Sequence, residues 1–324
     1  MAPNSILEII GNTPTVRLTR VSEDLGLNAF GKIEGLNPGG SIKDRTSLAM
    51  IQNGVACGKI SATTTIVESS SGNMAIGLAQ VCSYYGLKLI IVTDTKVNPH
   101  TLQMLRAYGA QIEMVNKPCI GSGLLGARLN KVKELLAVIP NSFSPNQYKN
   151  KLNPQTHFQT MAEIHQAVQH IDYVLVATST CGTLMGCASY LEENSPQTQL
   201  IAVDAIGSVI FGQPPCSRLI PGHGSGMPSS FLKKNSVHQV VAISDEECVE
   251  GCHYLLEKES ILAGGSSGAV VSALHQIKST IPNGSRCVLM LPDRGERYLD
   301  TIYNPSWVTE NFETVTPEKR KVSL

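Results

Sequence analysis

The sequence has no excess of charge of either sign and no apolar run long enough to span a membrane. Lysine plus arginine and aspartate plus glutamate number 26 each. A nucleic-acid-binding chain normally carries a basic excess or a clustered basic face, so this balance argues against a nucleic-acid partner. A transmembrane helix needs about 20 consecutive apolar residues, and no stretch of the sequence reaches that length. We therefore expect neither a nucleic-acid nor a membrane partner.

The cysteines lack the spacing of a disulfide framework or a zinc ribbon. There are nine of them, an odd number, and no C-x-x-C pair occurs. Cys248 and Cys252 lie one helical turn apart beside His253, but no second ligand pair accompanies them, so we expect packed thiols and no metal site. Free cysteines indicate a reducing compartment. The start "MAPNSILEIIG" resembles no signal peptide, and a cytoplasmic location is the default expectation.

What the sequence does contain is a regular alternation of short apolar runs with helical patterns. The apolar runs are "TTIVE" (64–68), "KLIIVTD" (88–94), "DYVLVAT" (172–178), "QLIAVDA" (199–205) and "RCVLMLP" (286–292). Such alternation predicts an α/β fold in which helices cover both faces of doubly wound parallel sheets. The 324 residues allow two domains, and we place the domain change in the segment 140–154. The Pro- and Gly-rich segment 207–230 is long for a loop and is a candidate functional loop.

Four Gly- and Ser-rich loops fall at strand-to-helix or comparable turns. They are "NPGGSIKDR" (37–45), "SSSGN" (69–73), "STCGT" (179–183) and "GGSSG" (264–268). Most loops of this kind are simply helix caps. "STCGT" nevertheless combines backbone N–H groups, hydroxyls and a helix N-terminus, which together suit a phosphate, and "SSSGN" could hold a carboxylate in the same way. Lys43 follows two glycines, and its amine is either a surface charge or a nucleophile whose pKa burial lowers.

Six motifs occur in the order found in the cysteine synthase and cystathionine β-synthase family, and the chain resembles that family from about Ser5 to Trp307. The motifs are "IGNTPTVRL", "NPGGSIKDR", "ESSSGNMAIGLA", "STCGTLMG", "ILAGGSSGA" and "LPDRGERYL". The resemblance implies a fold-type II enzyme with pyridoxal 5'-phosphate in the cleft between two doubly wound parallel-sheet domains. It further implies a larger domain of residues 1–40 and 147–324, a smaller mobile domain of residues 41–146, and a homodimer.

The resemblance also implies a role for each matched residue. Lys43 would form the Schiff base with the cofactor and then act as the proton carrier. Asn73 would bond to the ring hydroxyl of the cofactor, and Ser266 would be the partner of its ring nitrogen. Two loops complete the site, namely Ser179, Thr180, Cys181, Gly182 and Thr183 around the cofactor phosphate, and Ser70, Ser71 and Gly72 around the substrate carboxylate. Cys181 stands where the family usually has glycine.

Three positions differ from plain cysteine synthases. Tyr148 follows Gln147 where a sulfide-using enzyme typically has phenylalanine, Ser179 replaces the first glycine of the phosphate loop, and Arg128 lies on a helix predicted over 124–139. These features resemble the branch of N-(2-amino-2-carboxyethyl)-L-glutamate synthases of staphyloferrin B-type siderophore biosynthesis. That branch joins O-phospho-L-serine to L-glutamate and releases phosphate, on the way to 2,3-diaminopropionate. A fixed guanidinium suits either anionic substrate.

The residues leave alternatives open. Arg128 could be a solvated helix arginine, and Tyr148 and Ser179 could be packing variants. A cysteine synthase or O-phosphoserine sulfhydrylase that uses sulfide would share every cofactor residue. A catalytically silent binding protein on this fold fits less well because Lys43 is present, and a nucleotide-dependent dehydrogenase is more distant. The glutamate-using enzyme is the favoured hypothesis. Under it, we expect substrate contacts from Arg128, Gln147, Tyr148 and Ser179.

Overall fold

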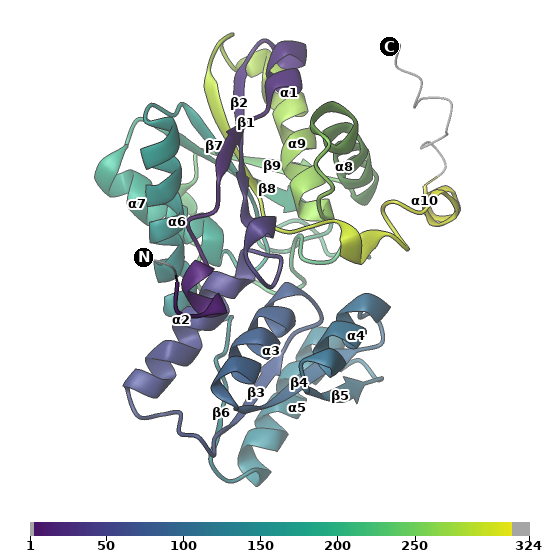
Figure 1. Cartoon of the computed structure of the whole chain (residues 1–324). Helices are drawn as coiled ribbons and strands as arrows, with labels where there is room; N and C mark the ends of the chain where they lie inside the picture. The colour runs from purple at the N-terminus through teal and green to yellow at the C-terminus, as the bar shows by residue number, and fades with distance from the viewer. Residues whose placement is uncertain (1–2, 313–324) are drawn as a thin grey trace.

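The strands of the chain form two sheets in a computed structural model that describes residues 3–312 (Figure 1). The larger sheet has the order β1 (Thr15–Arg17), β2 (Asn28–Ile33), β10 (Arg286–Leu291), β7 (Tyr173–Ala177), β8 (Gln199–Ala205) and β9 (Gln239–Ile243). The smaller sheet has the order β5 (Gln111–Val115), β4 (Lys88–Asp94), β3 (Thr65–Ser69) and β6 (Ser142–Phe143). β1 is antiparallel to β2, and the other pairings of these strands are parallel. The prediction of two parallel sheets is therefore confirmed.

Helices cover both faces of the larger sheet. Successive side chains of a strand point to opposite faces, and along β7 Val174 and Val176 belong to one core cluster while Leu175 belongs to the other. The first cluster involves α6 (Leu152–Val168) and α7 (Gly182–Asn194). The second involves α1 (Thr19–Leu25), α8 (Asp245–Glu259) and α9 (Gly265–Ile277). Burial on both faces explains why these strands are continuous apolar runs in the sequence.

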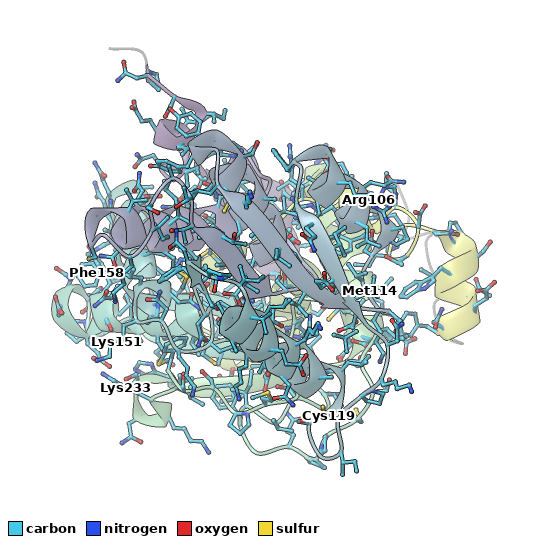
Figure 2. The ribbon with its side chains drawn as sticks, turned by 90° about the horizontal axis from the view of Figure 1, so that it is seen from below. Arg106, Met114, Cys119, Lys151, Phe158 and Lys233 are labelled. Atoms are coloured by element: carbon cyan, nitrogen blue, oxygen red, sulfur yellow. The ribbon has the colours of Figure 1, made fainter. Side chains whose placement is uncertain are left out.

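The smaller sheet is covered in the same way. The core on one face joins β3 and β4 to α2 (Lys43–Ala56), α3 (Asn73–Tyr85) and α4 (Pro99–Ala107). The core on the other face joins the same strands to α5 (Gly123–Val138) (Figure 1). β5 is an edge strand, and its Met114 is exposed (Figure 2). The remaining helices are short: η1 (Ile6–Ile9), η2 (Glu34–Leu36), η3 (Lys234–Ser236), η4 (Lys278–Thr280), η5 (Glu296–Tyr298) and α10 (Pro305–Asn311).

The expected strands match the observed ones closely. The strands predicted at 88–94 and 199–205 have those bounds, and the other three differ by one residue at one end or both. The sequence pattern did not predict β1, β2, β6 or β9. β1 and β2 lie in the larger sheet with β7 to β10, whereas β3 to β6 form the smaller one. The domain bounds 1–40, 41–146 and 147–324 stay a prediction.

Within residues 3–312, no helix is both long and apolar enough to cross a bilayer.

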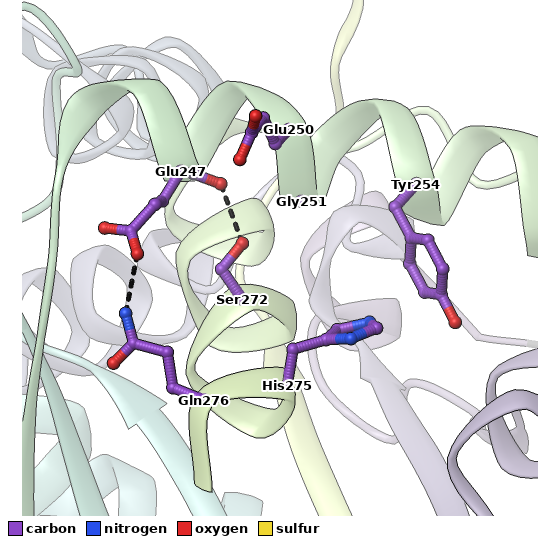
Figure 3. A pocket seen from close by; sticks show the side chains of 7 residues that line it. All are labelled: Glu247, Glu250, Gly251, Tyr254, Ser272, His275 and Gln276. Carbon is purple, nitrogen blue, oxygen red and sulfur yellow. Dashed lines mark hydrogen bonds between the residues drawn. The ribbon is translucent and has the colours of Figure 1, made fainter. Parts of the chain in front are cut away.

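α8 and α9 contact each other through glycines. A Cβ on Gly251 would lie 2.1 Å from the carbonyl oxygen of Gly268, and one on Gly268 would lie 2.0 Å from that of Cys248. Cys248 and Cys252 are fully buried in this contact, as packed thiols should be. Figure 3 shows the groove of about 300 Å³ beside it, where Gln276 Nε2 donates to Glu247 Oε1 at 2.6 Å. Because α9 begins with the "GGSSG" loop, this contact helps to place that loop.

We expect Gly251→Ala to destabilise the protein by about 1–3 kcal/mol, because the added methyl group must push α8 away from the Gly268 carbonyl. Urea unfolding of the cofactor-free protein measures this change. Glu257→Ala, an exposed position on the same helix, is the control and should change the stability by no more than about 0.5 kcal/mol. Equal stability of the two variants would contradict the close contact between the helices.

Candidate active site

The loop that carries Lys43 lies beside the loop that follows β10. Lys43 begins α2, after the loop that leaves β2. Since β2 and β10 are paired in parallel, both loops leave the larger sheet at the same edge. Ser41 forms a backbone bridge with Asp293, and the Ile42 N–H donates to the Pro292 carbonyl oxygen at 2.8 Å. The motifs "NPGGSIKDR" and "LPDRGERYL" are thus brought together.

A buried cluster of charges holds the first turn of α2. Arg45 Nη2 donates to Glu34 Oε1 at 2.8 Å and to Glu163 Oε2 at 2.6 Å. Lys32 Nζ also donates to Glu163 Oε2 at 2.6 Å. These four side chains are at most 8% exposed. Removal of one partner would leave an uncompensated buried charge, so the cluster fixes α2, and with it Lys43, against β2 and α6.

Lys43 is mostly buried, and its amine makes no hydrogen bond to another residue within 3–312. Burial lowers the pKa of this amine, while the charges of Asp293 and Glu34 oppose that shift. A lowered pKa increases the neutral, nucleophilic fraction of an amine. The setting of Lys43 therefore favours a nucleophile over a surface charge.

The "SSSGN" loop joins the end of β3 to α3 and meets Arg128. Ser70 Oγ accepts hydrogen bonds from the N–H groups of Gly72 at 3.3 Å and Ala75 at 3.1 Å, which fixes the loop. Ser71 Oγ accepts from Arg128 Nη1 at 2.9 Å. Arg128 is 8% exposed, so it is no solvated helix arginine.

Arg128 also contacts a carboxylate. Its Nε lies 3.2 Å from Oδ2 of Asp94, the last residue of β4. Planar guanidinium groups carry five donors, so these two contacts leave several N–H groups for other acceptors. The sequence analysis did not identify Asp94, although its place at the carboxyl end of a parallel strand is where polar site residues gather.

Gln147 and Tyr148 lie next to the same loop. Gln147 is buried, and its Nε2 donates to the Ser69 carbonyl oxygen at 3.1 Å. Burial raises the pKa of the Tyr148 phenol, and the nearby charge of Arg128 opposes this. Arg128 and Gln147 thus both contact the serine loop, and Tyr148 lies near Arg128; that these side chains contact substrate stays a prediction.

The long segment 207–230 contacts both the "STCGT" loop and Tyr148. The Gly224 N–H donates to the carbonyl oxygen of Thr178 at 2.7 Å, and Ser229 Oγ donates to that of Thr180 at 2.7 Å. The Ser230 hydroxyl donates to the carbonyl oxygen of Tyr148. This segment therefore joins the "STCGT" loop to Tyr148, which supports its interpretation as a functional loop.

The "STCGT" loop is built around a left-handed residue. Cys181 has φ +66° and precedes the first turn of α7. Non-glycine residues rarely adopt this conformation. Thr180 Oγ1 accepts from Asn153 Nδ2 at 3.1 Å and from the Gly182 N–H at 3.3 Å. Ser179 is partly exposed and Thr183 is buried. The first N–H groups of α7 thus gather where a phosphate could be bound.

The residues fit a pyridoxal phosphate. The site offers at Lys43 an amine that has no hydrogen-bond partner among the described residues, N–H donors at the start of α7, and a buried hydroxyl at Ser266. Asp293 and Asn153 add side-chain oxygens, Oδ1 in each case, that are buried and accept no hydrogen bond from residues 3–312. Such atoms are costly unless a bound group satisfies them. No group of three or more potential metal-ligating side chains occurs in the described part of the chain.

Several buried polar residues near the site were missed by the sequence analysis. Asp293 and Arg297 lie in the quoted motif "LPDRGERYL" but were given no role there. Glu68, at the end of β3, accepts from the N–H groups of Asn146 at 2.6 Å and Ser69 at 3.0 Å. Burial raises its pKa to about 7. A charged residue within an apolar strand was the available signal for Glu68.

Comparison with known proteins agrees with this geometry. The family model described as "Pyridoxal-phosphate dependent enzyme" matches residues 6–293. An O-acetylserine-dependent cystathionine β-synthase from Helicobacter pylori has 34% identity and a TM-score of 0.86 over 94% of this chain and 100% of its own. A hydrogen sulfide-producing enzyme from Fusobacterium nucleatum has 32% identity and a TM-score of 0.86 over 92% and 100%. O-ureido-L-serine synthase has 28% identity and a TM-score of 0.86 over 100% of both chains.

The chain therefore belongs to the family of pyridoxal-phosphate-dependent enzymes, and pyridoxal phosphate is its cofactor. Within that family it is an enzyme of the β-replacement type, like the cysteine synthases, cystathionine β-synthases and O-ureido-L-serine synthase that it resembles. The expected family, fold class and cofactor are thereby confirmed.

We expect Cys181→Gly to be more stable than Cys181→Ala by about 1 kcal/mol. Both variants lose the buried sulfur, but only glycine removes the Cβ that makes φ +66° unfavourable. Urea unfolding of the two cofactor-free variants measures the difference. An alanine variant as stable as the glycine variant would show that the loop changes conformation once the thiol is gone.

Proposed function

We propose that this enzyme joins O-phospho-L-serine to L-glutamate and releases inorganic phosphate, giving N-(2-amino-2-carboxyethyl)-L-glutamate. The Cβ–O bond of phosphoserine breaks and a bond forms between that Cβ and the glutamate nitrogen. The proton taken from Cα of phosphoserine returns to Cα, and the nitrogen loses one proton to solvent. The product would be a precursor of 2,3-diaminopropionate for a siderophore, made in the cytoplasm by a homodimer; these finer points depend on sequence resemblance.

The residues of the proposed site would have separate roles. Ser179, Thr180, Cys181, Gly182 and Thr183 would hold the cofactor phosphate. Lys43 would bind the cofactor carbon and move the Cα proton, for which its burial-lowered pKa is suited. Asn73 and Ser266 would contact the cofactor ring, and Ser70, Ser71 and Gly72 the substrate carboxylate. The cofactor, when bound, supplies the electron sink for the bond changes at Cα and Cβ.

The observation that carries the choice of substrates is the buried guanidinium of Arg128 on the serine loop. A substrate whose carboxylate lies on "SSSGN" would have its remaining groups near Arg128, which donates to Ser71. Phosphoserine brings a phosphate dianion and glutamate brings two carboxylates, and arginine binds both groups in bidentate fashion. Sulfide needs no such contact. The phenol of Tyr148 adds a further polar group beside this guanidinium.

One observation favours the alternative, a cysteine synthase that uses sulfide. Asp94 lies 3.2 Å from Arg128 Nε and offsets part of its positive charge. A neutralised arginine attracts anions less strongly and serves to shape the loop instead. The names of the similar enzymes, which include an O-acetylserine-dependent and a hydrogen sulfide-producing one, are compatible with this alternative.

The identity of the product decides between the two. The purified enzyme should be incubated with O-phosphoserine or O-acetylserine in combination with glutamate or sulfide, and the products identified by mass. N-(2-amino-2-carboxyethyl)-L-glutamate from phosphoserine supports the proposal. Cysteine from the sulfide mixtures, with no coupled product from either glutamate mixture, would overturn it and leave the sulfide-using enzyme.

We expect Arg128→Ala to lower kcat/KM for phosphoserine, glutamate or both by roughly ten- to hundredfold, because a lost hydrogen bond to a charged group costs about 1.5–3 kcal/mol. Steady-state kinetics measures this effect. Lys133→Ala, an exposed position on the same helix, is the matched control and should stay within about twofold of the wild-type value.

Tyr148→Phe and Ser179→Gly should raise the ratio of sulfide to glutamate use, since each removes a donor that sulfide does not need. Competition between the two nucleophiles in one reaction mixture gives this ratio directly. If neither variant changes the ratio, both residues are packing positions and the specificity argument fails.

A further inference from the structure

The carboxamide of Asn73 is held at both ends by the segment that follows β10. Its Nδ2 donates to Asp293 Oδ2 at 2.7 Å. Its Oδ1 accepts from Arg297 Nη1. A guanidinium can only donate, and an ionised carboxylate can only accept, so these two partners fix which end of the amide is nitrogen. One hydrogen of Nδ2 remains for an acceptor outside the pair.

Asp293 lies between Asn73 and the Lys43 loop. Its side chain is buried, and its Oδ2 accepts a second hydrogen bond from the Tyr298 hydroxyl at 2.6 Å. Its backbone is bridged to Ser41, two residues before Lys43. Its Oδ1 is buried and accepts no hydrogen bond from the described residues. Burial of a carboxylate oxygen without a partner is unfavourable. This oxygen is therefore suited to accept a hydrogen bond or to pair with a cation.

Arg297 connects the same parts of the site. It is buried, and its Nη2 donates to the Gly39 carbonyl oxygen in the loop before Lys43. Its own carbonyl oxygen accepts from Asn98 Nδ2, the residue that caps α4, at 2.8 Å. Segment 293–297 therefore ties the Lys43 loop of the larger sheet to the starts of α3 and α4 on the smaller one.

The electrostatic effects of Lys43 and Asp293 on each other agree with this arrangement. Burial lowers the pKa of the Lys43 amine, and the charge of Asp293 is the largest influence that raises it. Burial likewise raises the pKa of Asp293, while its hydrogen bonds from Tyr298 and Asn73 and the charges of Arg297 and Lys43 lower it. Lys43 and Asp293 thus stabilise each other's charged forms.

We infer that Asp293 is a positioning residue of this active site, with two effects that no residue in the serine or phosphate loops provides. It orients the Asn73 carboxamide so that the free Nδ2 hydrogen can meet the ring hydroxyl of the cofactor, and its Oδ1 is the negative charge that faces the Lys43 nitrogen. The inference depends on the roles of Lys43 and Asn73 in the proposed function, but not on the identity of the substrates.

The first test is a double-mutant cycle on cofactor affinity. Asp293→Asn keeps the shape of the side chain but removes the charge, and Asn73→Ala removes the group that Asp293 orients. Each single variant should raise the dissociation constant for pyridoxal phosphate about tenfold or more. If Asp293 acts through Asn73, the dissociation constant of the double variant should rise by clearly less than the product of the increases in the two single variants. Losses that simply multiply would overturn the inference.

The second test is the pH dependence of the visible absorbance of the bound cofactor. Loss of the Asp293 charge should lower by about one unit the pH at which the nitrogen joined to Lys43 loses its proton, a tenfold change in that equilibrium. Asp300→Asn removes an exposed carboxylate farther along the same segment and should leave the midpoint unchanged. An unmoved midpoint in Asp293→Asn would also overturn the inference.

Two controls separate this inference from the proposed function and from misfolding. Borohydride reduction of the wild-type enzyme and peptide mapping should place the pyridoxyl group on Lys43, and a label elsewhere would refute the site assignment itself. Circular dichroism of the cofactor-free variants checks their folding. Should Asp293→Asn not fold, Asp293→Ser removes the same charge with a smaller side chain and carries the same two expectations.

Discussion

β2 and β10 run parallel through six residue pairs, from Asn28 with Arg286 to Ile33 with Leu291, and the site is arranged around the edge where this pairing ends. One strand comes from the start of the chain and the other from near its end. Because parallel strands finish at the same edge of a sheet, the pairing brings the loop of Lys43 against Asp293. β7, the other neighbour of β10, ends in the "STCGT" loop at the same edge.

Much of what surrounds this edge is unfavourable in isolation. Charged side chains are buried in the cluster that holds α2, Cys181 has a left-handed backbone, and one oxygen of Asp293 has no hydrogen-bond partner within residues 3–312. Sites that bind a charged cofactor tolerate such features because the rest of the fold holds them in place. The apolar cores on both faces of the two sheets supply that stability here, since they bury most strand side chains.

The two sheets contribute different groups to the site. The serine loop, Arg128 and Asp94 come from the smaller sheet and its helices, whereas the "STCGT" loop, Ser266 and Asp293 come from the larger one. Contacts of segment 293–297 with Asn73 and Asn98 join the two parts. A shift of one sheet relative to the other would therefore move the serine loop and Arg128 relative to Lys43 and the "STCGT" loop, and closure of this kind around a substrate is common in enzymes.

The sequence by itself determined the class of fold and the loops of the site. Strands buried on both faces need continuous apolar runs, which is why β4 and β8 could be predicted to the residue. Ordered motifs likewise identified the family and cofactor. Local patterns carry no information on contacts between distant segments, so the burial of Arg128 and the bond between Asn73 and Asp293 could not be predicted.

Strand β2 shows the physical reason most clearly. "NAFGKI" contains a glycine and a lysine and does not read as a buried strand. Lys32 is nevertheless fully buried, because Glu163 of α6 and the Thr13 carbonyl oxygen accept hydrogen bonds from its amine. A buried charge is stable only beside its partner, and the tertiary structure alone decided where that partner lies.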